Sequence, residues 1–243
     1  MELVPNSKNS VVDIARRLGR DAGRLEFATP SHVYNPLQYA WTAHHAYLEQ
    51  FGNGVGRVLL LGMNPGPWGM AQTGVPFGDV VMAREWLGIE ASLGSPLPAQ
   101  HPKYPIMGFD CHRREGSGSR LWGWARERFE KPERFFERFF VWNYCPLLFI
   151  GDGRNMTPEK LRRAEADALT TVCNAALRSL LNSMGPVAVV GIGRYAERRA
   201  REVALDGVPV GYLPHPSPAS PAANRDWPAL AESALAPWLA KGK

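Results

Sequence analysis

Two carboxamides and one imidazole stand out in this chain of 243 residues, because each follows a short apolar run. Asn64 comes after the run 57–61, Asn143 lies in VWNYCPLLF, and His215 lies in LPHPSPASP. An amide offers both a donor and an acceptor, which suits a ligand edge of mixed polarity. An imidazole can donate a hydrogen bond to a developing negative charge. These residue types favour recognition of a small polar ring and stabilisation of charge on it.

Each of the three residues also has a purely structural explanation. The pair Asn64-Pro65 favours the start of a turn, and Asn143 could cap the segment that follows its strand. A single histidine is more often structural than catalytic. His215, however, stands between two prolines, which hold the backbone extended and fix the direction of the ring. This setting favours a functional role for His215.

The segment from Gly62 to Gly78, GMNPGPWGMAQTGVPFG, predicts a long turn that brings backbone close to a ligand. It holds five glycines and three prolines in seventeen residues, directly after an apolar run. Trp68 and Phe77 give it flat apolar surface. A purely structural loop could use glycine and proline as freely, but it would seldom retain these aromatic residues. The segment therefore favours a pocket for a small planar ring.

The positions of these residues depend on a pattern of strands alternating with helices. Apolar runs predict four strands, at 57–61, 139–142, 187–190 and 208–213. Helical spacing and start signals predict helices at 11–19, Pro36 to Leu48, Asp79 (as cap) to Leu87, 121–129, 132–138, Thr157 to Leu181, 194–203 and 227–239, with 94–118 irregular. This alternation predicts a parallel sheet covered on both faces. Its carboxyl edge would gather Asn64, Asn143 and His215 at one crevice.

Composition excludes several classes of protein. The net charge of +5 and the pI near 9.3 suit a polyanionic partner. Three cysteines lie far apart with no Cys-x-x-Cys pair, so a disulfide framework, a zinc ribbon or a four-cysteine iron–sulfur cluster is not expected. The sequence shows no signal-peptide pattern and no apolar run of membrane-spanning length. We expect one intracellular, monomeric domain over 1–243, with 1–30 as a helical extension, and no metal.

A second glycine-rich turn leaves an alternative open. Gly191-Ile192-Gly193, with Ala196 three residues on, follows a predicted strand and opens a helix, as a dinucleotide fingerprint does. It comes late in the chain, and no acidic residue stands at the expected distance. We interpret it as a close strand-to-helix turn, with nucleotide-cofactor binding as the alternative. A non-catalytic nucleic-acid-binding module is a further alternative.

Taken together, these segments resemble the uracil-DNA glycosylase superfamily, and within it the single-strand-selective monofunctional branch. The resemblance rests on GMNPGPWGMAQTGVPFG, VWNYCPLLF and HPSPASP, with NPLQYAW and TPEKL in support, and extends from about residue 30 to the end. It implies a three-layer α/β/α sandwich around a mainly parallel four-stranded sheet. It also implies a DNA repair enzyme that flips uracil out of DNA, hydrolyses its N-glycosidic bond and uses no cofactor.

The resemblance also implies a role for each residue of the site. Asn64 positions the attacking water, and His215 stabilises the departing base at O2. Asn143 binds the uracil edge, Phe77 stacks on the ring, and the backbone of Met63 and Phe77 completes the contact. Gly66 stands where other branches carry a bulky residue that excludes a 5-methyl group. Tolerance of 5-substituted uracils follows.

The loop after His215 departs from the branch pattern. The residues Ser217, Pro218, Ala219 and Ser220 match a DNA-binding wedge, but its common arginine is replaced by Ala219. We expect Arg225 to substitute for it. Neither this loop nor the first motif contains a lysine, which a Schiff-base lyase needs. The sequence therefore predicts a monofunctional enzyme that leaves an abasic site, in the cytoplasm or nucleoid of a bacterium or in a eukaryotic nucleus.

Overall fold

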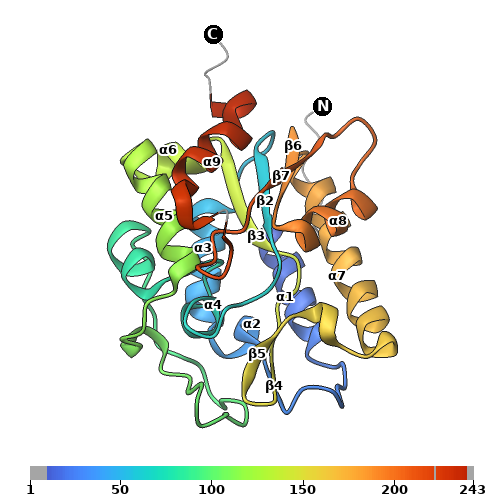
Figure 1. Cartoon of the computed structure of the whole chain (residues 1–243). Coiled ribbons are helices and arrows are strands. Elements are labelled where there is room, and N and C mark those ends of the chain that lie inside the picture. The colour runs from blue at the N-terminus through green and yellow to red at the C-terminus, as the bar shows by residue number, and fades with distance from the viewer. Residues whose placement is uncertain (1–9, 222, 240–243) are drawn as a thin grey trace, which may run out of the picture.

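A computed structural model describes residues 10–221 and 223–239, and its centre is a four-stranded parallel sheet (Figure 1). The strands are β2 (Val58–Gly62), β3 (Phe139–Asn143), β6 (Ala188–Ile192) and β7 (Val210–Leu213). Their order is β3-β2-β6-β7, and every pairing is parallel. All residues of β2, β3 and β6 are buried, as expected for strands covered on both faces. The predicted parallel sheet is confirmed.

Helices cover both faces of this sheet, so the predicted α/β class is also confirmed. Figure 1 shows α5, α6 and α9 on one side and α7 and α8 on the other. The helix α1 packs against α7. The helices are α1 (Val11–Ala22), α2 (Pro36–Tyr39), α3 (Trp41–Phe51), α4 (Met70–Thr73), α5 (Gly116–Phe129), α6 (Pro132–Phe136), α7 (Arg163–Met184), α8 (Arg194–Val203) and α9 (Ala223–Leu239).

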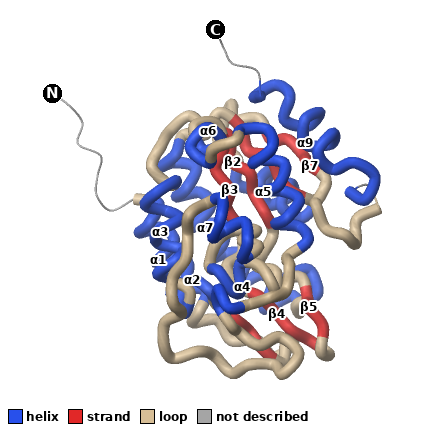
Figure 2. Tube along the Cα trace, turned by 90° about the vertical axis from the view of Figure 1, so that its left-hand side faces the viewer, coloured by secondary structure: helices blue, strands red, loops and turns tan. Residues whose placement is uncertain are grey.

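A second, antiparallel sheet was not predicted. It consists of β1 (His32–Tyr34), β4 (Leu148–Gly151) and β5 (Arg154–Met156), in the order β1-β4-β5. Figure 2 shows β4 and β5 at the end of the molecule away from α6 and α9. Strands of three or four residues are too short to show a period in the sequence. The turn between β4 and β5 is Asp152-Gly153, with φ values of 51° and 65°. This Asp-Gly pair is a hairpin signal that the sequence analysis missed.

Two predicted helices differ from the structure. The helix predicted from Thr157 begins only at Arg163, after a separate 3₁₀ turn over Pro158–Lys160. Glu165 fixes that later start, because its Oε2 accepts the N–H of Arg162 at 3.0 Å. The helix predicted from Pro36 to Leu48 is broken at Ala40, where φ is −105° and ψ is 26°.

Other predictions of local structure hold with shifted ends. Oδ1 of Asp79 accepts the N–H of Met82, the first residue of a π-helical turn over Met82–Trp86, at 3.3 Å. The last helix begins at Ala223, before the predicted Trp227, and is kinked at Asp226. Residues 1–9 of the predicted N-terminal extension lie outside the described residues. Within 10–30, α1 packs into the core through Ile14, Ala15 and Leu18.

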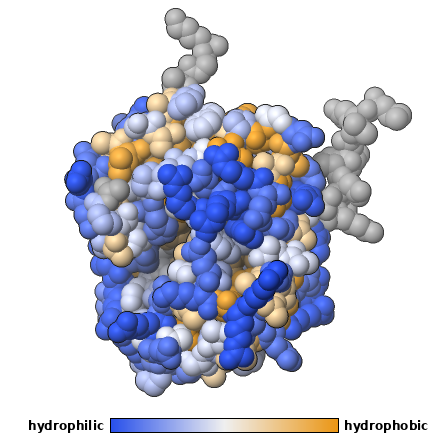
Figure 3. All heavy atoms as spheres, turned by 45° about the vertical axis from the view of Figure 1, so that its right-hand side comes forward, coloured by the Kyte–Doolittle hydropathy of each residue, from blue (hydrophilic) through white to orange (hydrophobic). Residues whose placement is uncertain are grey.

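The surface is mainly hydrophilic on the face that Figure 3 shows. The exposed large hydrophobic residues of the described chain are Val55, Leu97 and Val187. No helix among residues 10–221 and 223–239 combines the length and apolarity needed to cross a bilayer.

Candidate active site

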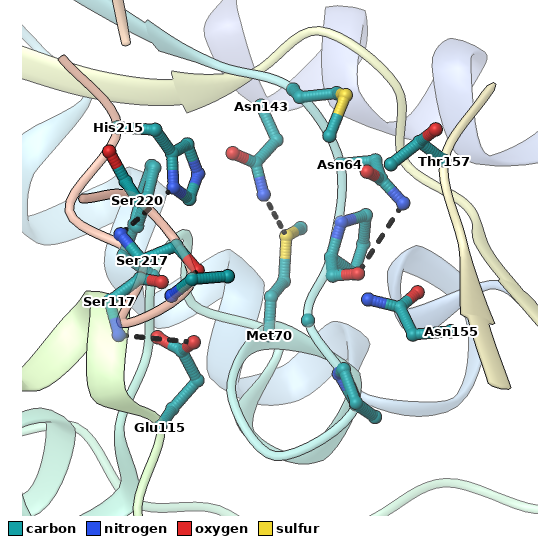
Figure 4. Close-up of a pocket in the computed structure, with 16 residues that line it drawn as sticks. Asn64, Met70, Glu115, Ser117, Asn143, Asn155, Thr157, His215, Ser217 and Ser220 are labelled. Carbon is teal, nitrogen blue, oxygen red and sulfur yellow. Dashed lines mark hydrogen bonds between the residues drawn. The ribbon is translucent and has the colours of Figure 1, made fainter. Parts of the chain in front are cut away.

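A cavity of about 440 Å³ opens beyond the carboxyl ends of β2, β3 and β7. Asn64 follows β2, Asn143 is the last residue of β3, and His215 follows β7. The parallel register places Gly62 beside Asn143, so the ends of β2 and β3 lie level. All three predicted polar side chains line the cavity (Figure 4). The remaining lining residues are Met63, Pro65, Gly66, Pro67, Met70, Phe77, Glu115, Ser117, Asn155, Thr157, Ser217, Ala219 and Ser220.

Asn143 presents an unpaired acceptor in this cavity. Its Nδ2 donates to Sδ of Met70 at 3.2 Å, whereas its Oδ1 is buried without a partner. Gly62 allows this position, because a Cβ there would lie 2.2 Å from that Oδ1 and 2.6 Å from Cε2 of Phe77. A buried carbonyl oxygen without a donor is costly. The site is therefore suited to a ligand that brings an N–H group to Asn143.

His215 is held as a neutral hydrogen-bond donor. Its Nδ1 lies 3.1 Å from the backbone N of Ser217, which can only donate, so Nδ1 is the acceptor and the ring proton resides on Nε2. Burial lowers the pKa of His215 to about 4. The ring centroid lies 5.9 Å from that of Phe77, at an interplanar angle of 39°. A neutral Nε2–H beside an aromatic ring suits a developing anion on a stacked ligand.

The backbone of Phe77 is fixed by close packing against α5. Phe77 adopts a left-handed conformation, with φ of 53°. Its carbonyl oxygen accepts the N–H of Asp79 at 2.8 Å. Gly118 of α5 lies so close that a Cβ there would be 1.9 Å from the same oxygen. Although burial raises the pKa of the Asp79 carboxyl, hydrogen bonds from Nε of Arg114 at 2.8 Å and from the N–H of Glu115 at 2.9 Å lower it below its usual value.

Asn64 is turned toward the segment that follows β3. Its Nδ2 donates to the carbonyl oxygen of Leu147 at 3.1 Å and, weakly, to that of Pro65 at 3.4 Å. Among the described residues, its Oδ1 has no hydrogen-bond donor. The amide is thus oriented by its nitrogen, and its oxygen remains free to accept a hydrogen bond from a water molecule.

The predicted DNA-binding residues are only partly brought together. Ser217, Ala219 and Ser220 line the cavity, whereas Pro218 is exposed and faces Gly116, where a Cβ would lie 2.7 Å from its Cγ. Arg225 is exposed at the start of α9 and does not line the cavity. Its predicted role as a substitute for the wedge arginine stays a prediction.

Four polar lining residues were missed by the sequence analysis: Glu115, Ser117, Asn155 and Thr157. Glu115 caps α5, accepting the N–H groups of Ser117 and Gly118, and burial raises its pKa. Asn155 and Thr157 come from the second sheet, which the sequence analysis did not predict. The Asp-Gly signal indicates the hairpin that carries Asn155, but not its position beside the cavity.

The glycine-rich turn after β6 has a packing explanation. A Cβ on Gly191 would lie 2.2 Å from the backbone N of Glu197, so β6 and α8 approach too closely for any other residue. Gly193, with φ of 89°, lies against His215, where a Cβ would be 3.4 Å from the Cβ of His215. This agrees with the interpretation as a close strand-to-helix turn. Within the described residues, no group of three His, Cys, Asp or Glu side chains is placed to hold a metal ion.

Comparison with known proteins identifies the family. The model of the uracil DNA glycosylase superfamily matches residues 49–236. The chain belongs to this superfamily. It is 48% identical to the single-strand selective monofunctional uracil-DNA glycosylase of Rattus norvegicus, over 90% of this chain and 80% of that protein. It is 46% identical to the Bos taurus protein of the same description, over 90% of this chain and 82% of the relative.

A solved structure shows the same fold. The crystal structure of Pedobacter heparinus SMUG2 matches with a TM-score of 0.61 and 17% identity, over 92% of this chain and 97% of that one. The family and the fold predicted from the sequence are thus confirmed.

Proposed function

We propose that this protein is a monofunctional DNA repair glycosylase that hydrolyses the N-glycosidic bond of uracil in DNA and leaves an abasic site. One observation carries the proposal: Asn64, Asn143 and His215, from three separate strand ends, border one cavity with Phe77. The curated relatives, which are named as monofunctional uracil-DNA glycosylases, support it.

His215 supplies the charge stabilisation in this mechanism. Cleavage of the bond leaves an electron-poor sugar and a uracil anion whose charge spreads to O2. The Nε2–H of neutral His215 donates to that oxygen, since Nδ1 is occupied by the N–H of Ser217. A donor of this kind contributes roughly a hundred- to a thousandfold in rate.

Asn64 acts by position. A carboxamide does not take up a proton near pH 7, so it is no general base. Its Nδ2 is held by the carbonyl oxygen of Leu147, and its Oδ1 orients the water that attacks the sugar. A stronger base is unnecessary if bond cleavage runs ahead of attack.

Asn143 reads the base. Its Oδ1 accepts the N3–H of uracil, and its Nδ2 exchanges the weak thioether acceptor of Met70 for O4. Phe77 stacks on the ring, and the backbone of Met63 and Phe77 completes the contact. Gly66 leaves room for a 5-substituent, because the nearest atom to a Cβ there would be Oε1 of Glu115 at 3.6 Å. We therefore expect 5-substituted uracils to be accepted.

The partner of the proposed enzyme is DNA, and we infer that it works as an intracellular monomer, in the bacterial cytoplasm or a eukaryotic nucleus. The net charge of +5 favours association with DNA. The proposed steps need no metal ion or cofactor, since protein groups stabilise the anion and place the water.

A cleavage assay tests this function. The protein is incubated with a single-stranded or duplex oligonucleotide that contains one deoxyuridine, and alkali-labile breaks are counted. We expect breaks at that site, and a loss of roughly a hundred- to a thousandfold in kcat for His215→Ala. His112→Ala, at an exposed position that does not line the cavity, is the control. Binding without breaks would instead indicate a non-catalytic module, and a borohydride-trapped adduct would overturn the monofunctional assignment.

A further inference from the structure

One wall of the cavity consists of two polar side chains to which the proposed reaction gives no role. Asn155 is the middle residue of β5, and Thr157 directly follows that strand. Both line the cavity, Asn155 exposed and Thr157 half-buried. Among the described residues, neither side chain has a hydrogen-bond partner. Their donors are therefore free to bind a ligand at the mouth of the cavity.

This wall lies on the same side of the cavity as Asn64, next to which the proposed reaction places the deoxyribose (Figure 4). Figure 4 shows Asn64, Thr157 and Asn155 on one side of the cavity and His215, Ser217 and Ser220 on the other, with Asn143 and Met70 between them. If the base lies against Asn143 and the deoxyribose against Asn64, the groups outward of Asn64 meet the linkage next to the sugar. This step depends on the proposed function.

We propose that Asn155 and Thr157 bind the phosphodiester adjacent to the extruded nucleotide, on the side of the cavity opposite the His215 loop. The amide Nδ2 and the hydroxyl group are neutral donors, and such side chains commonly hold phosphate oxygens and fix register on DNA. No lysine or arginine lines the cavity. The phosphate is thus held by directed hydrogen bonds from neutral groups. It forms no ion pair with a cationic side chain of the cavity, so little of this contact comes from the release of counterions.

The second sheet fixes the backbone that carries Asn155 before DNA binds. Asn155 is paired in register with Ile150 of β4, and the next residue, Met156, is buried opposite Phe149. A side chain on a paired strand loses only rotamer freedom when a ligand arrives, because the backbone is already ordered. The short hairpin therefore acts as a support for the backbone contact.

Asn155→Asp tests the contact through charge. We compare it with Asn155→Ala on single-stranded oligonucleotides with one deoxyuridine, carrying ordinary linkages or one uncharged methylphosphonate, 5′ or 3′ of that nucleotide. We expect KM to rise about tenfold for Asn155→Ala and about a hundredfold for Asn155→Asp, with kcat little changed. The excess loss in the Asp variant should disappear with methylphosphonate at one of the two linkages and persist at the other.

Asn53→Asp is the matched control. Asn53 is exposed and precedes β2, whereas the cavity lies beyond the other end of that strand. The substitution Asn53→Asp therefore adds the same negative charge far from the cavity. Thr157→Val is the second variant and should raise KM about tenfold at the same linkage. The phosphate contact would be refuted if KM were unchanged in the variants of both Asn155 and Thr157. It would also be refuted if the excess loss of Asn155→Asp over Asn155→Ala were the same whichever linkage is uncharged. Filter binding of the same oligonucleotides detects the contact without turnover, so DNA binding without uracil release would count against the proposed function alone.

Discussion

The guanidinium of Arg120 donates from Nη1 to the carbonyl oxygen of Pro216 at 3.1 Å, and so ties α5 to the residue that follows His215. Its Nη2 donates to Oδ1 of Asn224 at 2.9 Å, and Nδ2 of Asn224 donates to the carbonyl oxygen of Pro218 at 2.8 Å. One arginine and one asparagine thus hold two carbonyl groups of the His215 loop. The direction of the imidazole depends on this pair as well as on the flanking prolines.

We expect Arg120→Met to lower kcat by about ten- to a hundredfold with a smaller change in KM, because misplacement of a catalytic group by an ångström costs rate at this scale. Arg120→Lys should recover only part of the loss, since an ammonium lacks the planar fork that reaches two acceptors. Single-turnover rates of uracil release give the measurement. The control is Arg126→Met, an exposed arginine of the same helix. An equal loss in both variants would indicate an effect of net charge.

Gly62→Ala should disable the site through its geometry. The added methyl group would lie 2.2 Å from Oδ1 of Asn143, so the amide and the ring of Phe77 must move. We expect a loss of about a hundredfold or more in kcat/KM. Gly123→Ala, in α5, meets no atom within 4 Å and should instead raise the free energy of unfolding by about 0.5–1 kcal/mol. Urea unfolding followed with the activity assay separates these effects. Near-normal activity of Gly62→Ala would contradict the proposed role of Asn143.

The pH dependence of kcat should report a neutral His215. Burial lowers the pKa of its imidazole from 6.5 to about 4, so the form that donates from Nε2 persists as the pH falls. We expect kcat for uracil release to stay within about twofold between pH 8 and pH 5. A protonated Nδ1 would also face the donor N–H of Ser217. A tenfold fall in kcat between pH 6.5 and pH 5.5 would contradict this assignment.

Stability should fall at acid pH because of His44. This side chain is fully buried, its Nδ1 donates to the carbonyl oxygen of Gly74 at 2.7 Å, and its Nε2 has no partner. Burial lowers its pKa to about 4, whereas the unfolded chain takes up the proton near pH 6.5. The free energy of unfolding therefore decreases from pH 6.5 toward pH 4, with a slope approaching about 1.4 kcal/mol per pH unit from this residue. In urea titrations, His44→Phe should be less stable at pH 7 but show a shallower slope. An unchanged slope would refute the buried neutral imidazole.

The sequence by itself determined the main sheet and the three polar groups at its edge. Apolar runs mark buried parallel strands, and parallel strands end at one edge, so Asn64, Asn143 and His215 could be placed together without coordinates. The family resemblance then supplied the roles proposed for them. The placement of the sheet and of these three side chains succeeded because the information lies in contiguous segments, whereas the roles stay predictions.

Only the tertiary structure decided the opposite wall of the cavity. The strands β1, β4 and β5 are short and gain their stability from pairing, as between His32 and Ile150, which are far apart in the chain. No local period records such a pairing, so Asn155 and Thr157 could not be assigned to the site. The proton position on His215 was likewise decided by the N–H of Ser217, since a tautomer depends on the orientation of a neighbouring group and not on residue type.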